Sequence, residues 1–309
     1  MVDLILFGDC KETLKQFPRG SAQMCVTSPP YYGLRDYGGE ANQIGQEETP
    51  EEFVNNLVEV FREVRDVLKD DGVLWLNIGD SYYNYRPGTG GLPKQTVSRT
   101  SQDLPTQCNR RANKLDGLKE KDLIGIPWML AFALRADGWY LRQDIIWHKP
   151  NPMPESVKDR CTKSHEYIFL LSKNKKYYYD NEAIKEPVKQ DWGTRNRDAG
   201  KYHNPGTGLQ PHSGLTKSYE RKNKRDVWTI TNKPYKGAHF AVFPPDLIEP
   251  CILAGSQEGD IILDPFMGSG TTAMVAKKHR RSYIGCELHE DYASLQTDRI
   301  DSIPPQLVL

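Results

Sequence analysis

Residues 261–272 read Ile-Ile-Leu-Asp-Pro-Phe-Met-Gly-Ser-Gly-Thr-Thr, an apolar run followed by a glycine-rich turn and a helix start. The apolar run predicts a buried strand, and residues 271–279 predict a helix. Glycines let the backbone turn tightly and approach a ligand, and the start of a helix offers free N–H groups. The next predicted strand, 282–286, ends at Glu287, about 20 residues further on, where an acid commonly binds ribose hydroxyls. The stretch therefore predicts a nucleoside site at the carboxyl edge of an α/β sheet.

The glycine-rich turn differs from the two best-known nucleotide motifs. It lacks the third glycine of the dinucleotide fingerprint and the Gly-Lys-Ser/Thr of a phosphate loop. NAD and ATP therefore both fit poorly, and a nucleoside without a phosphate chain fits better. A strand-to-helix turn with a surface acid and no ligand is the alternative for this motif taken alone.

Strand and helix signals alternate along most of the chain, which predicts an α/β fold. The clearest helix begins with a capping box, Thr49 to Glu52, which has Pro50 at the first helical position, and we expect Asp71-Gly72 to end it. The other expected helices are 124–136, 247–253, 271–279 and 290–300, and the expected strands are 4–7, 24–27, 73–78, 140–147, 165–171, 261–263 and 282–286. The strands 140–147 and 165–171 are expected to pair antiparallel.

Two polar stretches interrupt this alternation. Residues 86–120 contain several glycines and prolines and few apolar residues, so we expect a long mobile loop there. Residues from about 176 to 235 show no sustained periodicity, which predicts an inserted module.

The composition disfavours several classes of protein. The chain has 309 residues, of which 38% are hydrophobic, and a mean hydropathy of −0.66. It contains no apolar run of about 18 residues, the length that spanning a bilayer requires, and no charged-then-apolar leader. The six cysteines stand singly, without a C-x-x-C pair, which indicates reduced thiols in a cytosol. We therefore expect neither a membrane protein nor a secreted one, and no metal site.

The net charge is zero, but the charges are unevenly distributed. Residues 151–240 hold 18 Lys and Arg against 10 Asp and Glu, a balance of +8, which leaves −8 for the rest of the chain. The block is also rich in Tyr, Trp, Asn and His, a mixture that contacts phosphates and base edges. An ordinary solvated surface explains the charge equally well, so composition leaves nucleic-acid binding open.

A second motif, Ser28-Pro29-Pro30-Tyr31, follows the predicted strand 24–27. Its two prolines fix the backbone, remove two N–H donors and leave carbonyl oxygens free to accept hydrogen bonds. Such acceptors suit an exocyclic amine that is also held by the serine hydroxyl, with Tyr31 stacked on the ring. A proline-rich turn that closes a strand is the alternative for this tetrapeptide in isolation.

Together the two motifs resemble those of the β-class DNA amino-methyltransferases, and the resemblance extends over most of the chain. These enzymes transfer a methyl group from S-adenosylmethionine to an exocyclic base nitrogen. The resemblance implies a class I (Rossmann-like) methyltransferase sheet that is circularly permuted, because the catalytic motif precedes the cofactor motif, with an inserted target-recognition region. The first four strands of that sheet would be, in order, 261–263, 282–286, 4–7 and 24–27.

The resemblance also implies roles for individual residues. The catalytic residues are Ser28, Pro29, Pro30 and Tyr31. The cofactor-binding residues are Asp9, Phe243, Pro244, Asp264, Pro265, Phe266, Gly268, Gly270, Thr271 and Glu287. The segment 146–154 resembles one that lines the target-base pocket. Expected DNA contacts are Arg110, Arg111, Trp147, Lys149, Lys175, Lys176, Arg195, Arg197, Arg221, Lys222, Lys224 and Arg225.

In this arrangement the chain has five parts. They are a catalytic half with the Ser-Pro-Pro-Tyr motif at 1–85, a mobile loop at 86–120, the remainder of the catalytic half at 121–175, a target-recognition insert at 176–235 and a cofactor-binding half at 236–309.

The function that follows is site-specific methylation of a flipped base in double-stranded DNA by direct displacement. Serine at position 28 is the form that the family most often associates with N4 of cytosine, and adenine N6 is the alternative. Two more distant alternatives are a DNA-binding module with a degenerate cofactor fold and a methyltransferase for RNA or small molecules. Cys251, which follows Pro250, is expected to be a buried thiol and not a nucleophile.

The resemblance further implies a cytoplasmic, nucleoid-associated protein of bacterial, archaeal or phage origin. Its partners would be duplex DNA and a cognate restriction endonuclease, and the protein would be a monomer or a homodimer.

Overall fold

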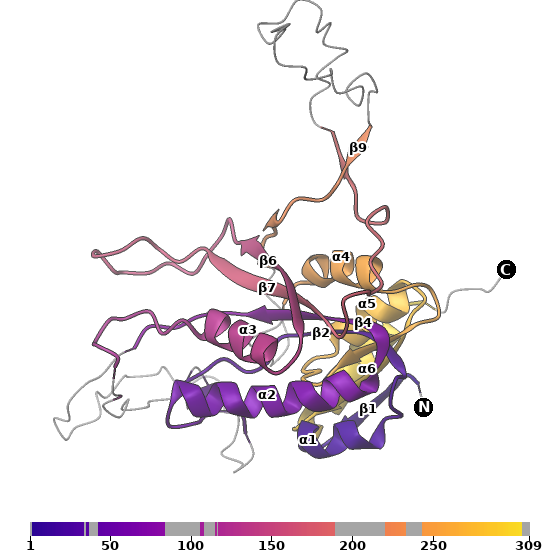
Figure 1. The fold of residues 1–309 in the computed structure, drawn as a ribbon, viewed down its shortest axis with the longest axis horizontal. Coiled ribbons are helices and arrows are strands. Elements are labelled where there is room, and N and C mark those ends of the chain that lie inside the picture. The colour runs from indigo at the N-terminus through magenta and orange to yellow at the C-terminus, as the bar shows by residue number, and fades with distance from the viewer. Residues whose placement is uncertain are drawn as a thin grey trace, which may run out of the picture.

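The computed structural model describes residues 2–33, 35–36, 43–83, 106–107, 115, 117–188, 220–232 and 243–304. Most of the loop expected at 86–120 therefore lies outside the described residues. A single large sheet with helices on both faces forms the body of the described chain (Figure 1). No helix in the described ranges combines the length and the apolar character needed to cross a membrane.

The strands and helices follow the expected alternation. The strands are β1 (Leu4–Phe7), β2 (Ala22–Thr27), β3 (Arg35–Asp36), β4 (Leu68–Ile78), β5 (Thr106–Gln107), β6 (Tyr140–His148), β7 (His165–Ser172), β8 (Glu186–Pro187), β9 (Arg221–Lys222), β10 (Val227–Thr229), β11 (Ile261–Asp264) and β12 (Ser282–Glu287). The helices are α1 (Cys10–Thr13), α2 (Pro50–Val67), α3 (Ile126–Ala136), α4 (Pro245–Gly255), α5 (Thr271–Lys278) and α6 (Ala293–Asp301). Short 3-10 turns precede α6 and follow α1.

The central sheet has the order β1-β12-β11-β2-β4-β7-β6-β10. Strand β7 runs antiparallel to both of its neighbours, and the other pairs are parallel. The expected first four strands are thus adjacent, because β11 lies between β12 and β2 and β1 pairs with β12. This order confirms the permuted class I sheet and the antiparallel pairing of β6 with β7.

The two faces of the sheet carry separate apolar cores. Residues of α1, α2 and α3 pack on one face with Leu74 and Leu76, and residues of α4, α5 and α6 pack on the other with Val73 and Trp75. Alternate residues of β4 therefore point to opposite faces, as the period of a strand requires. Because both faces are covered, a ligand reaches this sheet most directly at its edges.

Helix α2 begins where the sequence predicts, but it ends earlier than predicted. The Thr49 hydroxyl accepts a hydrogen bond from the Glu52 N–H at 3.1 Å, and the Glu52 carboxylate accepts one from the Thr49 N–H at 3.2 Å, which confirms the capping box. The expectation that Asp71-Gly72 ends the helix is wrong, because α2 ends at Val67 and the backbone at Leu68 is already extended. Residues 69–72 instead form an irregular start to β4, where its register with β2 shifts.

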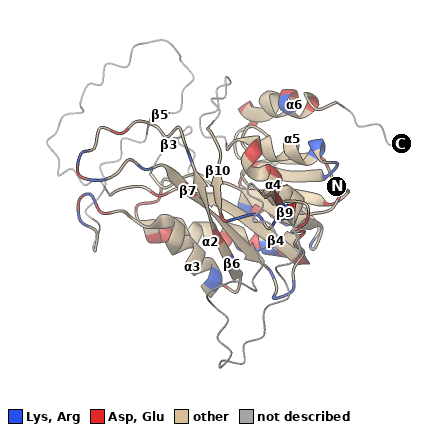
Figure 2. Cartoon of the chain, turned by 90° about the horizontal axis from the view of Figure 1, so that it is seen from above, with Lys and Arg blue, Asp and Glu red and all other residues tan. Residues whose placement is uncertain are grey.

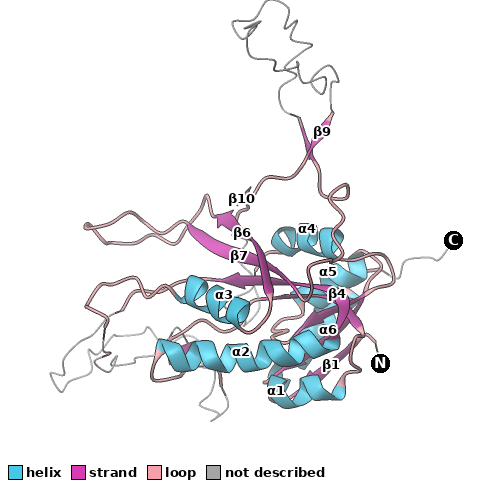
Figure 3. Ribbon diagram, in the orientation of Figure 1, coloured by secondary structure: helices cyan, strands magenta, loops and turns pink. Residues whose placement is uncertain are grey.

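One strand of the sheet comes from the stretch that was expected to be an insert. Strand β10 pairs with β6 at the edge of the sheet, and its Trp228 side chain is buried. The short β8–β9 ribbon belongs to the same stretch, and Figure 3 shows it standing away from the sheet. The described parts of 176–235 therefore include both an edge of the core and a projecting ribbon.

Candidate functional site

The two sequence motifs meet at one edge of the sheet. Strands β1, β12, β11 and β2 are parallel neighbours, so their carboxyl ends lie side by side. Pro265 follows β11, and Ser28 follows β2. An open α/β sheet binds its ligands at this edge. The geometry therefore places the glycine-rich turn and the tetrapeptide in one region.

A buried carboxylate joins the two motifs. One oxygen of Asp264 accepts a hydrogen bond from the Thr27 hydroxyl at 2.6 Å, and the other accepts one from the Thr272 hydroxyl at 2.6 Å. The Phe266 N–H donates a third, at 3.0 Å. Burial raises the pKa of the Asp264 carboxyl to about 6, while these hydrogen bonds act in the opposite direction. Asp264 thus ties the end of β2 to the turn and to the start of α5.

The glycine-rich turn needs its glycines for conformation and for close approach. Gly268 and Gly270 have φ angles of +53° and +79°, a region that side chains with a β carbon rarely adopt. A β carbon on Gly270 would also lie 3.3 Å from the α carbon of Gln296. The hydroxyl of Thr271, at the first position of α5, is buried and has no hydrogen-bond partner within the described ranges.

Glu287 ends β12 and faces this turn. Its carboxylate accepts hydrogen bonds from the Gly268 N–H at 2.7 Å and from the His289 N–H at 3.1 Å. Burial raises the pKa of Glu287 to about 7, although these N–H groups favour the ionised form. A carboxylate oxygen has two lone pairs, so the group keeps acceptor capacity for a ligand hydroxyl.

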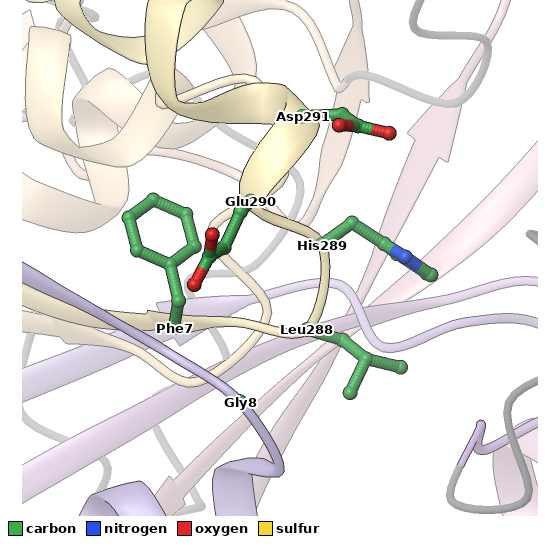
Figure 4. Close-up of a pocket in the computed structure, with 6 residues that line it drawn as sticks. All are labelled: Phe7, Gly8, Leu288, His289, Glu290 and Asp291. Carbon is green, nitrogen blue, oxygen red and sulfur yellow. The ribbon is translucent and has the colours of Figure 1, made fainter.

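A pocket of about 380 Å³ opens next to Glu287. Figure 4 shows the residues that line it, at the ends of β1 and β12: Phe7, Gly8, Leu288, His289, Glu290 and Asp291. Asp9 follows Gly8, caps the start of α1 through the Lys11 N–H at 2.9 Å and lines a second pocket of about 310 Å³. Each residue of the Gly8-Asp9 turn therefore lines a hollow in the region expected to hold a nucleoside.

The remaining expected cofactor residues, Phe243 and Pro244, lead into α4. Phe243 packs against the core of this face, and Pro244 caps the helix. Gly255, the last residue of α4, lies against Met24 on β2 and Val73 on β4. Helix α4, which these two residues precede, therefore packs on β2 and β4.

The tetrapeptide is held in place from two sides. Pro29 is buried, and a β carbon on Gly45 would lie 3.1 Å from the Tyr31 carbonyl oxygen. A β carbon on Gly79 would lie only 2.7 Å from Cε2 of the Tyr31 ring, so the ring packs directly on the backbone after β4. The Tyr31 hydroxyl donates a hydrogen bond to Glu166 on β7 at 2.7 Å.

Sequence reasoning did not identify four of the residues that shape this region. They are Thr27, Asn77, Gly79 and Glu166, and each lies within or just after a predicted strand. A weak signal was present, because a carboxylate in the otherwise apolar run of β7 and a threonine at the end of β2 are unusual in buried strands. Their partners could not be inferred, because those partners lie in distant segments of the chain.

Two expected DNA contacts are internal in this structure. Only 3% of Trp147 is exposed, and its Nε1 donates a hydrogen bond to the Ile230 carbonyl at 2.9 Å. The ring therefore offers no free face to a base in this structure, which does not fit the DNA contact expected of Trp147. The Lys149 ammonium forms an ion pair with Glu166 and is mostly buried, so it is poorly placed to bind phosphate.

Among the residues that the structure describes, the other expected DNA contacts do not gather around the tetrapeptide. Lys175 and Lys176 are exposed but follow β7, which runs antiparallel to β4 and therefore ends toward the opposite edge of the sheet. Arg221 and Lys222 form β9, while Lys224 and Arg225 lie 3.9 and 3.5 Å from Glu186. Arg110, Arg111, Arg195 and Arg197 lie outside the described residues. In Figure 2, acidic and basic segments alternate along the loops.

The sheet and the site agree with comparisons to known proteins. The model of the DNA methylase family named for N6 and N4 methyltransferases matches residues 22–298. The type II methyltransferase M.SmaI of Serratia marcescens is 48% identical over 96% of this chain and 90% of its own length. The type II methyltransferase M.Cfr9I of Citrobacter freundii is 46% identical over 95% of this chain and 86% of its own.

Solved structures show the same fold at lower identity. PvuII DNA methyltransferase (cytosine-N4-specific) superposes with a TM-score of 0.61 at 19% identity, covering 95% of this chain and 84% of its own. The M1.HpyAVI–SAM complex superposes with a TM-score of 0.54 at 17% identity, covering 96% of this chain and 98% of its own. With the family model matching most of its length and two relatives close to half identical, the chain belongs to the N6- and N4-methyltransferase family of DNA methylases.

Proposed function

We propose that this DNA methyltransferase transfers a methyl group from S-adenosylmethionine to the exocyclic N4 amine of a cytosine flipped out of a specific site in duplex DNA. The observation that carries the proposal is the 2.6 Å hydrogen bond between Thr27 and Asp264, which sets the tetrapeptide beside the glycine-rich turn. Serine at position 28 supports cytosine. Adenine N6 is the second candidate, since the same geometry suits either amine.

The residues at the strand edge fit S-adenosylmethionine. Glu287 has acceptor capacity for ribose hydroxyls, and the pocket beside it can take a nucleoside. The Thr271 hydroxyl, which is buried and has no partner among the described residues, and the N–H groups at the start of α5 suit a charged amino-acid group. Further residues proposed to line the site are Asp9, Phe243, Pro244, Pro265, Phe266, Gly268 and Gly270. When bound, the cofactor supplies an electrophilic methyl group.

The chain contributes mainly by holding the amine in position. The Ser28 hydroxyl and the Pro29 carbonyl would accept hydrogen bonds from the amino group, which directs its lone pair toward the methyl donor. Tyr31 would stack on the base, and the released proton would leave to solvent. Correct orientation of the two reactants can account for much of the rate acceleration, so no covalent enzyme intermediate is needed. Consistent with this, Cys251 is buried, and burial raises the pKa of its thiol.

Extruding the base costs a few kcal/mol, and the enzyme must offset that cost through stacking and backbone contacts. We assign the backbone contacts to the basic residues of 176–235 and of 86–120, which remain the proposed recognition insert and loop. The relatives are type II methyltransferases of bacteria, which supports a cytoplasmic location and a cognate restriction endonuclease as a partner of this monomer or homodimer.

The test is to incubate the purified protein with tritiated S-adenosylmethionine and unmethylated genomic DNA, then to digest the DNA and separate the nucleosides with mass detection. Label in N4-methylcytosine is the expected result. Label in N6-methyladenine would overturn the choice of base but keep the enzyme class. Bound cofactor with no labelled nucleoside would overturn the proposal as a whole. Parallel incubation with RNA controls for a different acceptor.

A further inference from the structure

Glu166 lies outside both sequence motifs, yet three polar side chains converge on it. The Tyr31 hydroxyl donates a hydrogen bond to Glu166 Oε2 at 2.7 Å, and Asn77 Nδ2 donates a longer one to the same oxygen at 3.3 Å. The Lys149 ammonium forms an ion pair with Oε1. These partners come from three different segments of the chain, so Glu166 connects β4, the end of β6 and the tetrapeptide.

The Lys149 ammonium and the Glu166 carboxylate carry opposite charges and pair directly. The side chains of Lys149 and Glu166 are 16% and 14% exposed, so both have lost most of their contact with water. The Lys149 ammonium also lies 4.1 Å from the centroid of the Trp147 ring, which favours a cation. A carboxylate buried without such a partner would be strongly destabilising, so the Lys149 ammonium offsets the cost of burying the Glu166 carboxylate beside Tyr31.

Fold stability alone gives little reason for this pair. Well-packed apolar residues usually serve a protein interior as well as a buried ion pair does. A carboxylate differs from an apolar residue in accepting a directional hydrogen bond. The bond from Tyr31 is such a bond, and it is charge-assisted, which makes it stronger than one between neutral groups.

The Tyr31 ring is therefore constrained at two points. Its Cε2 edge packs on Gly79, where even a single added β carbon would approach to 2.7 Å, and its hydroxyl is bound by Glu166. Contact at Gly79 limits how far the ring can move toward β4, and the hydrogen bond limits its rotation. A platform for a flipped base needs a ring with one fixed plane, since a mobile ring must lose its freedom when the base stacks.

We propose that Glu166 is a positioning residue for base methylation, which holds the Tyr31 ring in the orientation that receives the flipped base, with Lys149 as the cation that neutralises it. The inference rests on the proposed function, because it assigns the ring to the target base. It gives Lys149 a role inside the protein in place of the phosphate contact expected from the sequence.

The experiment separates the acceptor function of Glu166 from its charge. The first variant is Lys149→Met with Glu166→Gln, which removes both charges but keeps an acceptor for the Tyr31 hydroxyl. The second is Lys149→Met with Glu166→Leu, which removes the acceptor as well. Steady-state kcat and KM with unmethylated DNA, the Kd of S-adenosylmethionine by calorimetry and a thermal unfolding curve are measured for each.

The glutamine variant is expected to keep kcat/KM for DNA within about threefold of the native protein, and the leucine variant to lose about tenfold, the effect of one charge-assisted hydrogen bond. Cofactor affinity should be the same in both. Tyr31→Phe should lose a similar factor alone and nothing further in the leucine background. Equal activity of the two double variants at equal thermal stability would overturn the inference, as would additive losses with Tyr31→Phe.

A matched control is Glu249→Gln. Glu249 lies on α4, and its carboxylate pairs with Lys278 and His279 at the end of α5, so the substitution should leave all these constants unchanged. The native protein separates the two hypotheses. If it labels no DNA, the proposed function fails. If it labels DNA but the two double variants behave alike, only the role of Glu166 fails.

Discussion

The hydroxyl of Thr27 and the carboxylate of Asp264 are 2.6 Å apart, although 237 positions separate them in the chain. Thr27 is the last residue before the tetrapeptide, and Asp264 is the first polar residue of the glycine-rich turn. The hydrogen bond is fully buried, so its geometry fixes the distance between the two motifs. In a permuted sheet, this contact joins segments that lie near opposite ends of the sequence.

Replacing Thr27 by Val should break this contact while keeping the side-chain shape. The buried Asp264 oxygen would lose one of its donors, and we expect the free energy of unfolding to fall by about 1–3 kcal/mol. The rate of methyl transfer should fall as well, because the tetrapeptide loses its fixed position. Thr297→Val is a suitable control, since that exposed hydroxyl donates its hydrogen bond to the Ala293 carbonyl of the same helix. Urea unfolding of the two variants makes the comparison, and equal midpoints would contradict the prediction.

Cofactor affinity should increase with pH around neutrality. Glu287 has a pKa raised to about 7, and its ionised form is the better acceptor for ribose hydroxyls. Binding should therefore lower the pKa of Glu287 and release a proton. Calorimetry between pH 6 and pH 8 in buffers of different ionisation enthalpy measures both effects. Glu287→Gln should bind more weakly with little pH dependence. Proton uptake on binding would contradict the assignment.

The Glu287 carboxyl should also affect folding stability. Its contribution to stability should decrease as pH rises, whereas cofactor affinity should increase. Its pKa is raised above the ordinary value of 4.5, so the folded state holds this proton more tightly than the unfolded state does. Its contribution is therefore fully present below about pH 4.5 and is lost as pH rises through about 7. Glu287→Gln should gain stability relative to the native protein as pH rises over this window. A constant difference in Tm would show that the carboxyl titrates normally in the folded state.

Ser28→Ala should reduce turnover far more than cofactor affinity. The serine hydroxyl is proposed to contact the amine and not the methyl donor, so kcat should fall roughly ten- to a hundredfold while the Kd of S-adenosylmethionine stays unchanged. Single-turnover methylation and calorimetry separate the two constants. Native turnover in the alanine variant would remove Ser28 from the mechanism.

Gly79→Ala should disturb the Tyr31 ring. The added β carbon would approach Cε2 of the ring to 2.7 Å, so the ring must shift and its bond to Glu166 must weaken. We expect a fall in kcat/KM for DNA of about tenfold or more, in line with a small misplacement of a positioning group. In the background of Tyr31→Ala the substitution should have little further effect, because the clash is gone. Additive losses would show that Gly79 matters for another reason.

Local patterns in the sequence predicted the elements and much of their arrangement. The alternating strand and helix signals gave the α/β class, and the capping box at Thr49 marked the start of α2. The order of the two motifs, through the family resemblance, predicted which strands are neighbours, as the pairing of β11 with β12 and β2 confirms. These features depend on residues close together in the chain, or on the order of motifs, so they can be read without coordinates.

The partners of individual side chains depended on the assembled sheet. Trp147 is of a residue type that often stacks on bases, yet the pairing of β6 with β10 encloses its side chain. Glu166 could have been an exposed carboxylate on an edge strand, but β7 lies between β4 and β6, which brings Tyr31 and Lys149 to it. Burial and hydrogen bonding of a strand residue follow from which strands flank it and in what register. That information comes from contacts between distant segments, so the periodicity of one segment does not contain it.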